Sequence, residues 1–196
     1  MVTKFDCDKL LKRLAAAITE NPQGSIKDQL NAAGISETSF YRIFGSKDGF
    51  EHKLKMKTRA VLSDIICISG SSFDSYYEGL KLVIEAHIVH KEIICFLCLN
   101  PFSLCFDNDN IYEQEVNYWI PYKKALEAFF VKGGKKGDFK FEFNQEELTN
   151  YLLLTIVATV TMKKNEELST EELVGKVEQL FLYGVAGRGQ ADGYLD

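Results

Sequence analysis

The sequence predicts an all-α chain with a small N-terminal unit of three helices, two of which form a helix-turn-helix, and a larger C-terminal helical unit. Two observations predict this class. Apolar residues recur at the spacing of amphipathic helices along most of the chain. Strand signals are scarce, because the alternating run 139–143 is isolated. We expect the first domain over 1–48, the second over 49–186, and a flexible tail over 187–196.

The first helix is predicted by apolar residues at positions i, i+3, i+4, i+7, i+8 and i+11. These residues are Cys7, Leu10, Leu11, Leu14, Ala15 and Ile18. The run Asn21-Pro22-Gln23-Gly24 ends the helix, and Ser25 is placed to cap the next one.

The stretch 26–44 reads as two short helices joined by a tight turn. Gly34 supplies the backbone freedom that a sharp reversal needs, and Ser36 is a suitable N-cap for the second helix. Phe40 and Phe44 are four residues apart, so they share one face that can pack inward. The outward face then carries Thr38 and Arg42, flanked by Ser39 and Tyr41. Such a helix suits a DNA major groove, although an ordinary surface hairpin has the same spacing.

The charge is divided unevenly along a chain whose net charge is −5. Residues 1–60 hold eleven Lys/Arg and seven Asp/Glu, a net charge of +4, whereas the other 136 residues hold twelve and twenty-one, a net charge of −9. This asymmetry is expected when only the first part meets phosphate.

The sequence also bounds where the protein works. Its longest apolar run, within 152–162, is well short of the ~20 residues of a membrane span. The N-terminus lacks a secretory signal, and the five cysteines do not resemble a disulfide framework. We therefore expect a cytoplasmic protein without membrane contact.

Three segments of the N-terminal unit, 25–28 (SIKD), 33–36 (AGIS) and 39–48 (SFYRIFGSKD), resemble the DNA-binding domain of tetracycline-repressor-like (TetR-family) transcriptional regulators. The resemblance covers about the first 60 residues. It implies a homodimer on a palindromic operator in double-stranded DNA. It also implies that Ser25 and Lys47 bind phosphates, that Tyr41 contacts the backbone, and that the face of Thr38, Ser39 and Arg42 meets bases. The predicted DNA-binding residues are Ser25, Ser36, Glu37, Thr38, Ser39, Tyr41, Arg42 and Lys47.

Three positions depart from the family pattern, namely Glu37, the pair Leu30-Asn31, and Ile43. Glu37 either favours the N-terminus of its helix or contacts a cytosine amino group. These departures leave the operator sequence open.

Beyond the N-terminal unit, the pattern predicts further helices over 48–66, 73–100, 111–132, 145–163 and 170–185. Pro121 is expected to kink or restart its helix, and 133–138 (GGKKGD) to form a turn. The last two helices are apolar over more than one face, which requires burial on more than one side. They match the helices through which TetR-like proteins dimerise, and the predicted interface residues are Leu152, Thr155, Ile156, Thr159, Val177, Leu180 and Phe181.

Aromatic residues cluster between positions 73 and 130, where they either line a cavity or form plain core. In a TetR-like body they imply a site for a small apolar or aromatic effector. The predicted lining is Phe73, Tyr77, His87, Phe96, Phe102, Phe106, Tyr118, Trp119 and Tyr122. Ligand binding in this domain would tilt the helix over 48–66 and release the DNA.

Other functions fit less well. Cys95 and Cys98 lack the context of a metal site and are interpreted as buried thiols, so we expect no metal and no cofactor. Catalytic motifs are absent, and we expect no catalytic residues and no enzyme. The sequence therefore predicts a ligand-responsive transcriptional repressor. The alternatives are a helical protein-interaction module that does not bind DNA and, less well supported, a small helical enzyme.

Overall fold

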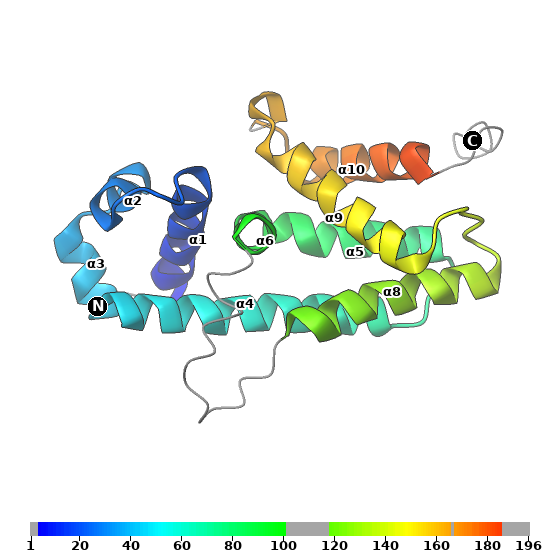
Figure 1. Ribbon diagram of the computed structural model, residues 1–196, viewed down its shortest axis with the longest axis horizontal. Helices are drawn as coiled ribbons and strands as arrows, with labels where there is room; N and C mark the ends of the chain where they lie inside the picture. Colours follow the sequence, from blue (N-terminus) through cyan, green and yellow to red (C-terminus); the bar gives the residue numbers. More distant parts are fainter. Residues whose placement is uncertain (1–3, 101–117, 166, 186–196) are drawn as a thin grey trace. The chain divides into compact units, whose positions relative to one another are not determined.

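The computed structural model describes residues 4–100, 118–165 and 167–185, with side chains from residue 7 onward. All regular structure in these residues is helical, which confirms the predicted all-α class (Figure 1). The elements are α1 (Lys4–Glu20), α2 (Ile26–Ala32), α3 (Glu37–Phe44), α4 (Lys47–Gly70), α5 (Tyr76–Val89), α6 (Lys91–Leu99), α8 (Trp119–Lys136), α9 (Gln145–Thr161), the 3-10 helix η1 (Lys163–Asn165) and α10 (Thr170–Val185).

The chain divides into two compact units. The first takes its described residues from 1–61 and 92–117, and the second from 62–91 and 118–196. Because the division falls between Val61 and Leu62, α4 contributes residues to both units. The predicted tail 187–196 lies outside the described residues.

In the helix-turn-helix of the first unit, capping residues fix where α2 and α3 begin. The Ser25 hydroxyl accepts a hydrogen bond from the Asp28 amide at 3.2 Å, and the Asp28 carboxylate accepts one from the Ser25 amide at 3.1 Å, so α2 begins with a capping box. Ser36 caps α3 by accepting a hydrogen bond from the Ser39 amide at 3.2 Å. Between the two helices Gly34 has φ +63°, a conformation that favours glycine. The predicted caps and turn are confirmed.

The core of the first unit is aromatic at the junction of α3 and α4. The ring centroid of Phe40 lies 5.1 Å from that of Phe44 and 5.7 Å from that of Phe50. All three side chains are buried, together with Leu14 of α1 and Leu30 of α2. Burial of a phenylalanine side chain stabilises a fold by about 1.5–3 kcal/mol, so this cluster fixes how α3 is turned.

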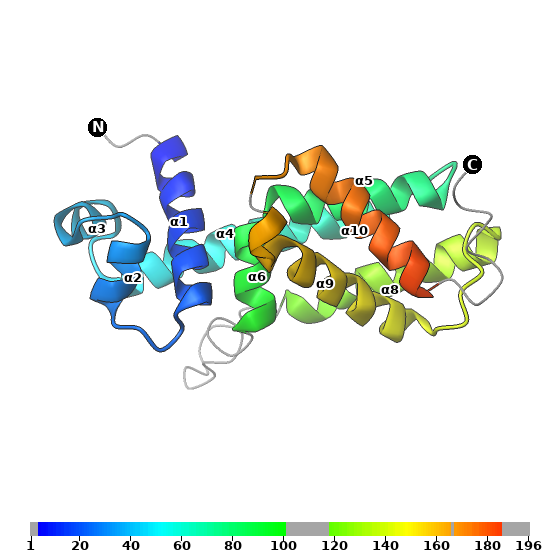
Figure 2. The same ribbon diagram turned by 90° about the horizontal axis from the view of Figure 1, so that it is seen from above.

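The second unit is a layered packing of long helices. Helix α10 packs against α5 and α9, and α9 also packs against α8 (Figures 1 and 2). Its core contains Leu80, Ile84, Phe129, Ile156, Val177 and Phe181, all fully buried. In the described part of the chain, we find no helix both long and apolar enough to cross a membrane.

Several boundaries differ from the sequence-based expectation. Helix α4, expected to end at residue 66, continues to Gly70, and the helix expected from residue 73 begins at Tyr76. The helix expected over 73–100 is interrupted at His90, whose φ of −117° and ψ of 26° end α5. The apolar pattern runs through this break and gives no sign of it. Helix α8 also continues through Gly133 to Lys136, where a turn was expected from 133 onward. Pro121 lies in the first turn of α8, where its missing N–H is not needed for a hydrogen bond within the helix, and the part of the expected helix before residue 118 lies outside the described residues.

Gly133 lies inside α8, and its missing side chain makes room for the ring of Phe139. A Cβ atom at Gly133 would lie 2.4 Å from the ring of Phe139 and 3.1 Å from Cβ of Tyr76. We predict that Gly133→Ala lowers the free energy of unfolding by about 1–3 kcal/mol, because it overpacks this contact. Chemical denaturation measures the change.

Gly134→Ala is the matched control, because its Cβ would meet only the Phe139 carbonyl oxygen at 4.0 Å. The control should be neutral, or stabilise the helix by up to about 1 kcal/mol. Equal effects of the two substitutions would contradict the close contact.

Candidate nucleic-acid interface and effector region

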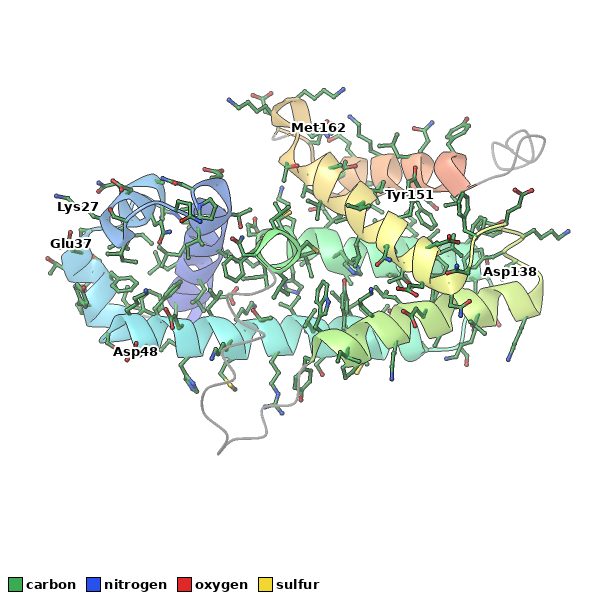
Figure 3. All side chains as sticks on the ribbon, in the orientation of Figure 1. Lys27, Glu37, Asp48, Asp138, Tyr151 and Met162 are labelled. Atoms are coloured by element: carbon green, nitrogen blue, oxygen red, sulfur yellow. The ribbon has the colours of Figure 1, made fainter. Side chains whose placement is uncertain are left out.

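Helix α3 presents a polar face that carries most of the predicted DNA-binding residues. Glu37, Thr38, Tyr41 and Arg42 are exposed, and Tyr41 keeps 52% of its surface accessible. Ser39 is half-buried beside Ser36, whose hydroxyl donates a hydrogen bond to its oxygen at 3.0 Å. Figure 3 shows the Glu37 side chain directed away from the helix bundle of this unit. The structure thus brings this predicted set together on one helix and its cap.

Ser25 and Lys47 flank that face, and each already has a partner in its own helix. The Ser25 hydroxyl donates a 2.6 Å hydrogen bond to the Asp28 carboxylate, and this contact lowers the pKa of Asp28. A phosphate at Ser25 would therefore compete with Asp28 for the hydroxyl proton. Lys47 lies 3.7 Å from the Glu51 carboxylate in an exposed pair, which is weak in water and leaves the ammonium group available.

Basic side chains of α4 divide into two kinds. Lys53 donates a 2.8 Å hydrogen bond to the Ile43 carbonyl oxygen and lies 5.3 Å from the centroid of the Phe44 ring. Lys57 pairs with Asp8 of α1 at 2.6 Å. These two lysines hold α4 to α3 and α1. By contrast Lys27 of α2 is exposed beside Ser25, and it is a phosphate-contact candidate that the sequence analysis did not single out.

The predicted effector residues of the second unit form two groups at opposite ends of α5. Phe73 and Tyr77 pack at its start, with the centroids of Phe73 and Phe129 5.9 Å apart and those of Tyr77 and Phe139 5.3 Å apart. His87 lies ten residues further along, about 15 Å away on the helix. Its ring centroid is 5.8 Å from that of Tyr122. The structure therefore does not place both groups around one point.

The second group contains a buried polar contact. His87 Nδ1 lies 2.6 Å from the Val83 carbonyl oxygen, and Nε2 lies 2.7 Å from the Tyr122 hydroxyl. A carbonyl oxygen can only accept, so Nδ1 carries the proton and Nε2 accepts from the tyrosine. Burial lowers the pKa of His87 to about 4, although the Val83 carbonyl acts in the opposite direction. The imidazole is therefore neutral near pH 7.

Trp119 continues this group, with its ring centroid 5.3 Å from that of Tyr122, while Tyr118 and Trp119 are both half-buried at the start of α8. Phe96 is buried in α6, and it belongs to the first unit. Phe102 and Phe106 lie outside the described residues.

The cysteine pair of α6 has the properties of buried thiols. Cys95 is buried and Cys98 is half-buried. Burial, with a contribution from Cys95, raises the pKa of Cys98 to about 12, so its thiol is protonated and unreactive near neutral pH. Among the described residues, no three His, Cys, Asp or Glu side chains are grouped so that they could hold a metal ion.

Six of the seven predicted interface residues on α9 and α10 are part of the chain's own core. Leu152, Ile156, Val177 and Phe181 are fully buried, and Thr155 and Thr159 are nearly so. Leu180 alone of the seven is exposed, at 45%. The large apolar side chains that α9 and α10 present to solvent are Tyr151, Leu154, Leu180 and Tyr183.

The neutral state of His87 makes the stability of the protein depend on pH. In the unfolded chain the imidazole titrates near pH 6.5, and in the folded chain at about 4. The unfolded state therefore binds an extra proton between these values, and the contribution of His87 to stability is complete above pH 6.5 and is lost as the pH falls towards 4.

We predict that this loss reaches about 3 kcal/mol and is absent in His87→Phe. The check is the difference in unfolding free energy between the two proteins from pH 7 to 4, in which the carboxylates common to both cancel. Parallel pH curves would contradict a buried neutral imidazole.

The comparisons with known proteins agree with this architecture. No family model matches the chain. The HTH-type transcriptional regulator NfxB of Pseudomonas aeruginosa is 27% identical over 179 residues, which are 91% of this chain and 94% of that protein. The proteins to which the chain is similar are transcriptional regulators rather than enzymes.

Solved structures share the fold at low identity. The TetR-family regulator PfmR of Thermus thermophilus superposes with a TM-score of 0.57 at 17% identity, covering 95% of this chain and 98% of its own. LfrR of Mycobacterium smegmatis, solved in complex with proflavine, gives a TM-score of 0.57 at 12% identity over 92% and 96%. A TetR-family member from Streptomyces coelicolor gives 0.58 at 16% over 91% of each chain. The chain therefore has the fold of these solved TetR-family transcriptional regulators.

Proposed function

We propose that the protein is a transcriptional repressor that binds a palindromic DNA operator as a homodimer and is released by a small apolar or aromatic ligand. The observation that carries this proposal is the division of α3 into two faces. Phe40 and Phe44 are buried, and Thr38, Tyr41 and Arg42 are exposed together on the other side. A helix held by its apolar face, with hydroxyl, phenol and guanidinium groups outside, fits the major groove.

The distribution of charge along the chain also supports DNA binding by the N-terminal domain. The first 60 residues carry a net charge of +4 in a chain whose net charge is −5. A modestly basic domain on an acidic body directs the phosphate backbone to that domain. The sequence similarity to a helix-turn-helix regulator covers 91% of the chain and therefore includes α2 and α3.

A homodimer is supported by the apolar surface of α9 and α10. Leu154 is 67% exposed and Tyr183 46%, although both are large apolar side chains on helices that also form the core. Apolar side chains grouped on a surface favour burial against another protein surface. A two-fold dimer would present two copies of α3 to half-sites about one turn of DNA apart, ~34–36 Å.

The ligand proposal draws on the group at the end of α5 and the start of α8. His87 is neutral and hydrogen-bonded to Tyr122, and Trp119 adds a large aromatic surface. A neutral, aromatic environment favours an apolar or aromatic ligand over a phosphate or sugar. The structurally similar LfrR was solved with proflavine, which is an aromatic compound.

The experiment that tests DNA binding uses fluorescence anisotropy on duplexes from the region upstream of the protein's own gene. We predict that Arg42→Ala weakens operator binding about 10- to 100-fold and reduces the preference over unrelated DNA. Lys47→Ala should weaken binding to all sequences alike and lower the salt dependence by about one phosphate contact.

Lys124→Ala serves as the control, because this exposed lysine of α8 belongs to the other unit. If Arg42→Ala and Lys47→Ala both bind like the wild type, α3 is not the DNA-reading helix. If the wild type shows no salt-dependent binding to any duplex, the protein-interaction alternative replaces the repressor.

Placing a charged residue on the proposed dimer surface tests the homodimer. We predict that Leu154→Glu yields a folded monomer in analytical ultracentrifugation, because a carboxylate in an apolar interface loses its hydration. Loss of operator affinity should accompany the monomer. Leu82→Glu, at a residue of α5 that is 47% exposed, is the matched control and should remain dimeric. A Leu154→Glu protein that stays dimeric would exclude this surface.

A further inference from the structure

We infer that three side chains at the end of α8, Lys132, Lys136 and Asp138, fix the far end of α4 and thereby set the spacing at which the protein accepts DNA half-sites. They are called the α8 clamp below. The inference rests on the proposed function, since it assigns a positioning role for operator binding to residues far along the chain from α3.

The first half of the α8 clamp acts on the C-terminal end of α4. The last carbonyl groups of a helix lack partners within the helix and carry partial negative charge, so they favour a cation. The last turn of α4 contains no basic residue of its own. Lys132, which is 62 positions away in the sequence, supplies the cation. Its ammonium group donates a 2.7 Å hydrogen bond to the carbonyl oxygen of Gly70, the final residue of α4.

Lys136 holds the connection that follows α4. Its ammonium group donates a 2.9 Å hydrogen bond to the Phe73 carbonyl oxygen and a second, short one to the carbonyl oxygen of Asp74. It also lies 6.0 Å from the centroid of the Tyr76 ring. One lysine thus fixes two successive peptide groups between α4 and α5.

The second half of the α8 clamp acts on the N-terminal end of α5, where the charge preference is reversed. Ser75 occupies the N-cap position but makes no capping hydrogen bond with its side chain. The Asp138 carboxylate replaces it, accepting a 2.7 Å hydrogen bond from the Tyr76 amide. Figure 3 shows Asp138 in the turn that follows α8.

Local backbone geometry places these groups. Gly137 ends α8 with φ +88°, a left-handed conformation that turns the chain back at once and puts Asp138 one residue later. The amide of Asp138 donates to the Gly133 carbonyl oxygen at 3.1 Å, which holds the turn. Two cations from the last two turns of α8 and an anion from the turn that follows it therefore meet helix ends of the opposite polarity.

The consequence for DNA follows from the length of α4. Its 24 residues span about 36 Å, and only two residues separate the end of α3 from its first residue, Lys47. We take α4 to move as one body, so that a tilt of about 5° at one end displaces the other end by about 3 Å. Successive base pairs are about 3.4 Å apart along the DNA axis. A small tilt at the clamped end of α4 would therefore displace the other end, next to α3, by about the length of one base pair.

The experiment compares operator duplexes of natural half-site spacing with duplexes in which one base pair is inserted or deleted at the centre. The test protein is Lys132→Met with Lys136→Met, which keeps the apolar stems and removes both ammonium groups. Lys135→Met, at an exposed lysine of the same turn, is the matched control. Fluorescence anisotropy gives the affinity ratio between the spacings, and thermal unfolding is measured on the same proteins.

The wild type and Lys135→Met should prefer the natural spacing by about tenfold or more, and the double variant should reduce this preference to about twofold. Loss of affinity at all spacings with the preference unchanged would mean that the lysines only stabilise the fold, and would overturn the inference while the proposed function stands. A wild type that binds no duplex would overturn the proposed function, and this inference with it.

Hydrogen exchange at the Tyr76 amide tests the Asp138 contact separately from DNA. The amide should exchange faster in Asp138→Ala and at nearly the wild-type rate in Asp138→Asn, since the asparagine side-chain oxygen can still accept the hydrogen bond. Equal protection in all three proteins would show that Asp138 does not hold the start of α5, and would remove that half of the α8 clamp.

Discussion

The burial of Phe40 and Phe44 against Phe50 decides which side of α3 the protein presents to its surroundings. The cluster joins α3 to the first turn of α4, and Lys53 adds a hydrogen bond to the end of α3. Because α3 has only eight residues, it depends on this packing and on its Ser36 cap rather than on its own helix propensity. Burial of Phe40 and Phe44 therefore fixes the orientation of the exposed face that carries Thr38, Tyr41 and Arg42.

The second unit shows how charge can order helices from a distance. The α4–α5 connection has no basic side chain in the last turn of α4 and no side-chain cap at the start of α5. Residues at and just after the end of α8 supply both missing groups. Lys132 binds the last carbonyl group of α4, and Asp138 accepts a hydrogen bond from the first amide of α5. Further along α5 and α8 the contact is uncharged, since burial keeps His87 neutral beside Tyr122. The two helices are thus tied by charge at one end and by a neutral hydrogen bond at the other.

Helices α9 and α10 show where reasoning from sequence is weakest. A helix with apolar residues all round gives no periodic signal for which face turns inward. The predicted interface therefore fell mostly on core residues such as Ile156 and Phe181, whereas Leu154 and Tyr183 remain exposed. Exposed apolar side chains remain on both helices, so the homodimer stays a proposal that rests on these exposed residues rather than on the buried ones.

By itself, the sequence determined the helical class, the capping serines, the Gly34 turn and the two faces of α3, because these features depend on neighbours within about four residues. Only the tertiary structure decided the features that join distant segments. It separated the predicted effector residues into two groups along α5, paired His87 with Tyr122 across 35 positions, and brought Lys132 to Gly70 across 62. Local spacing carries no record of such contacts, since they form only when whole helices pack.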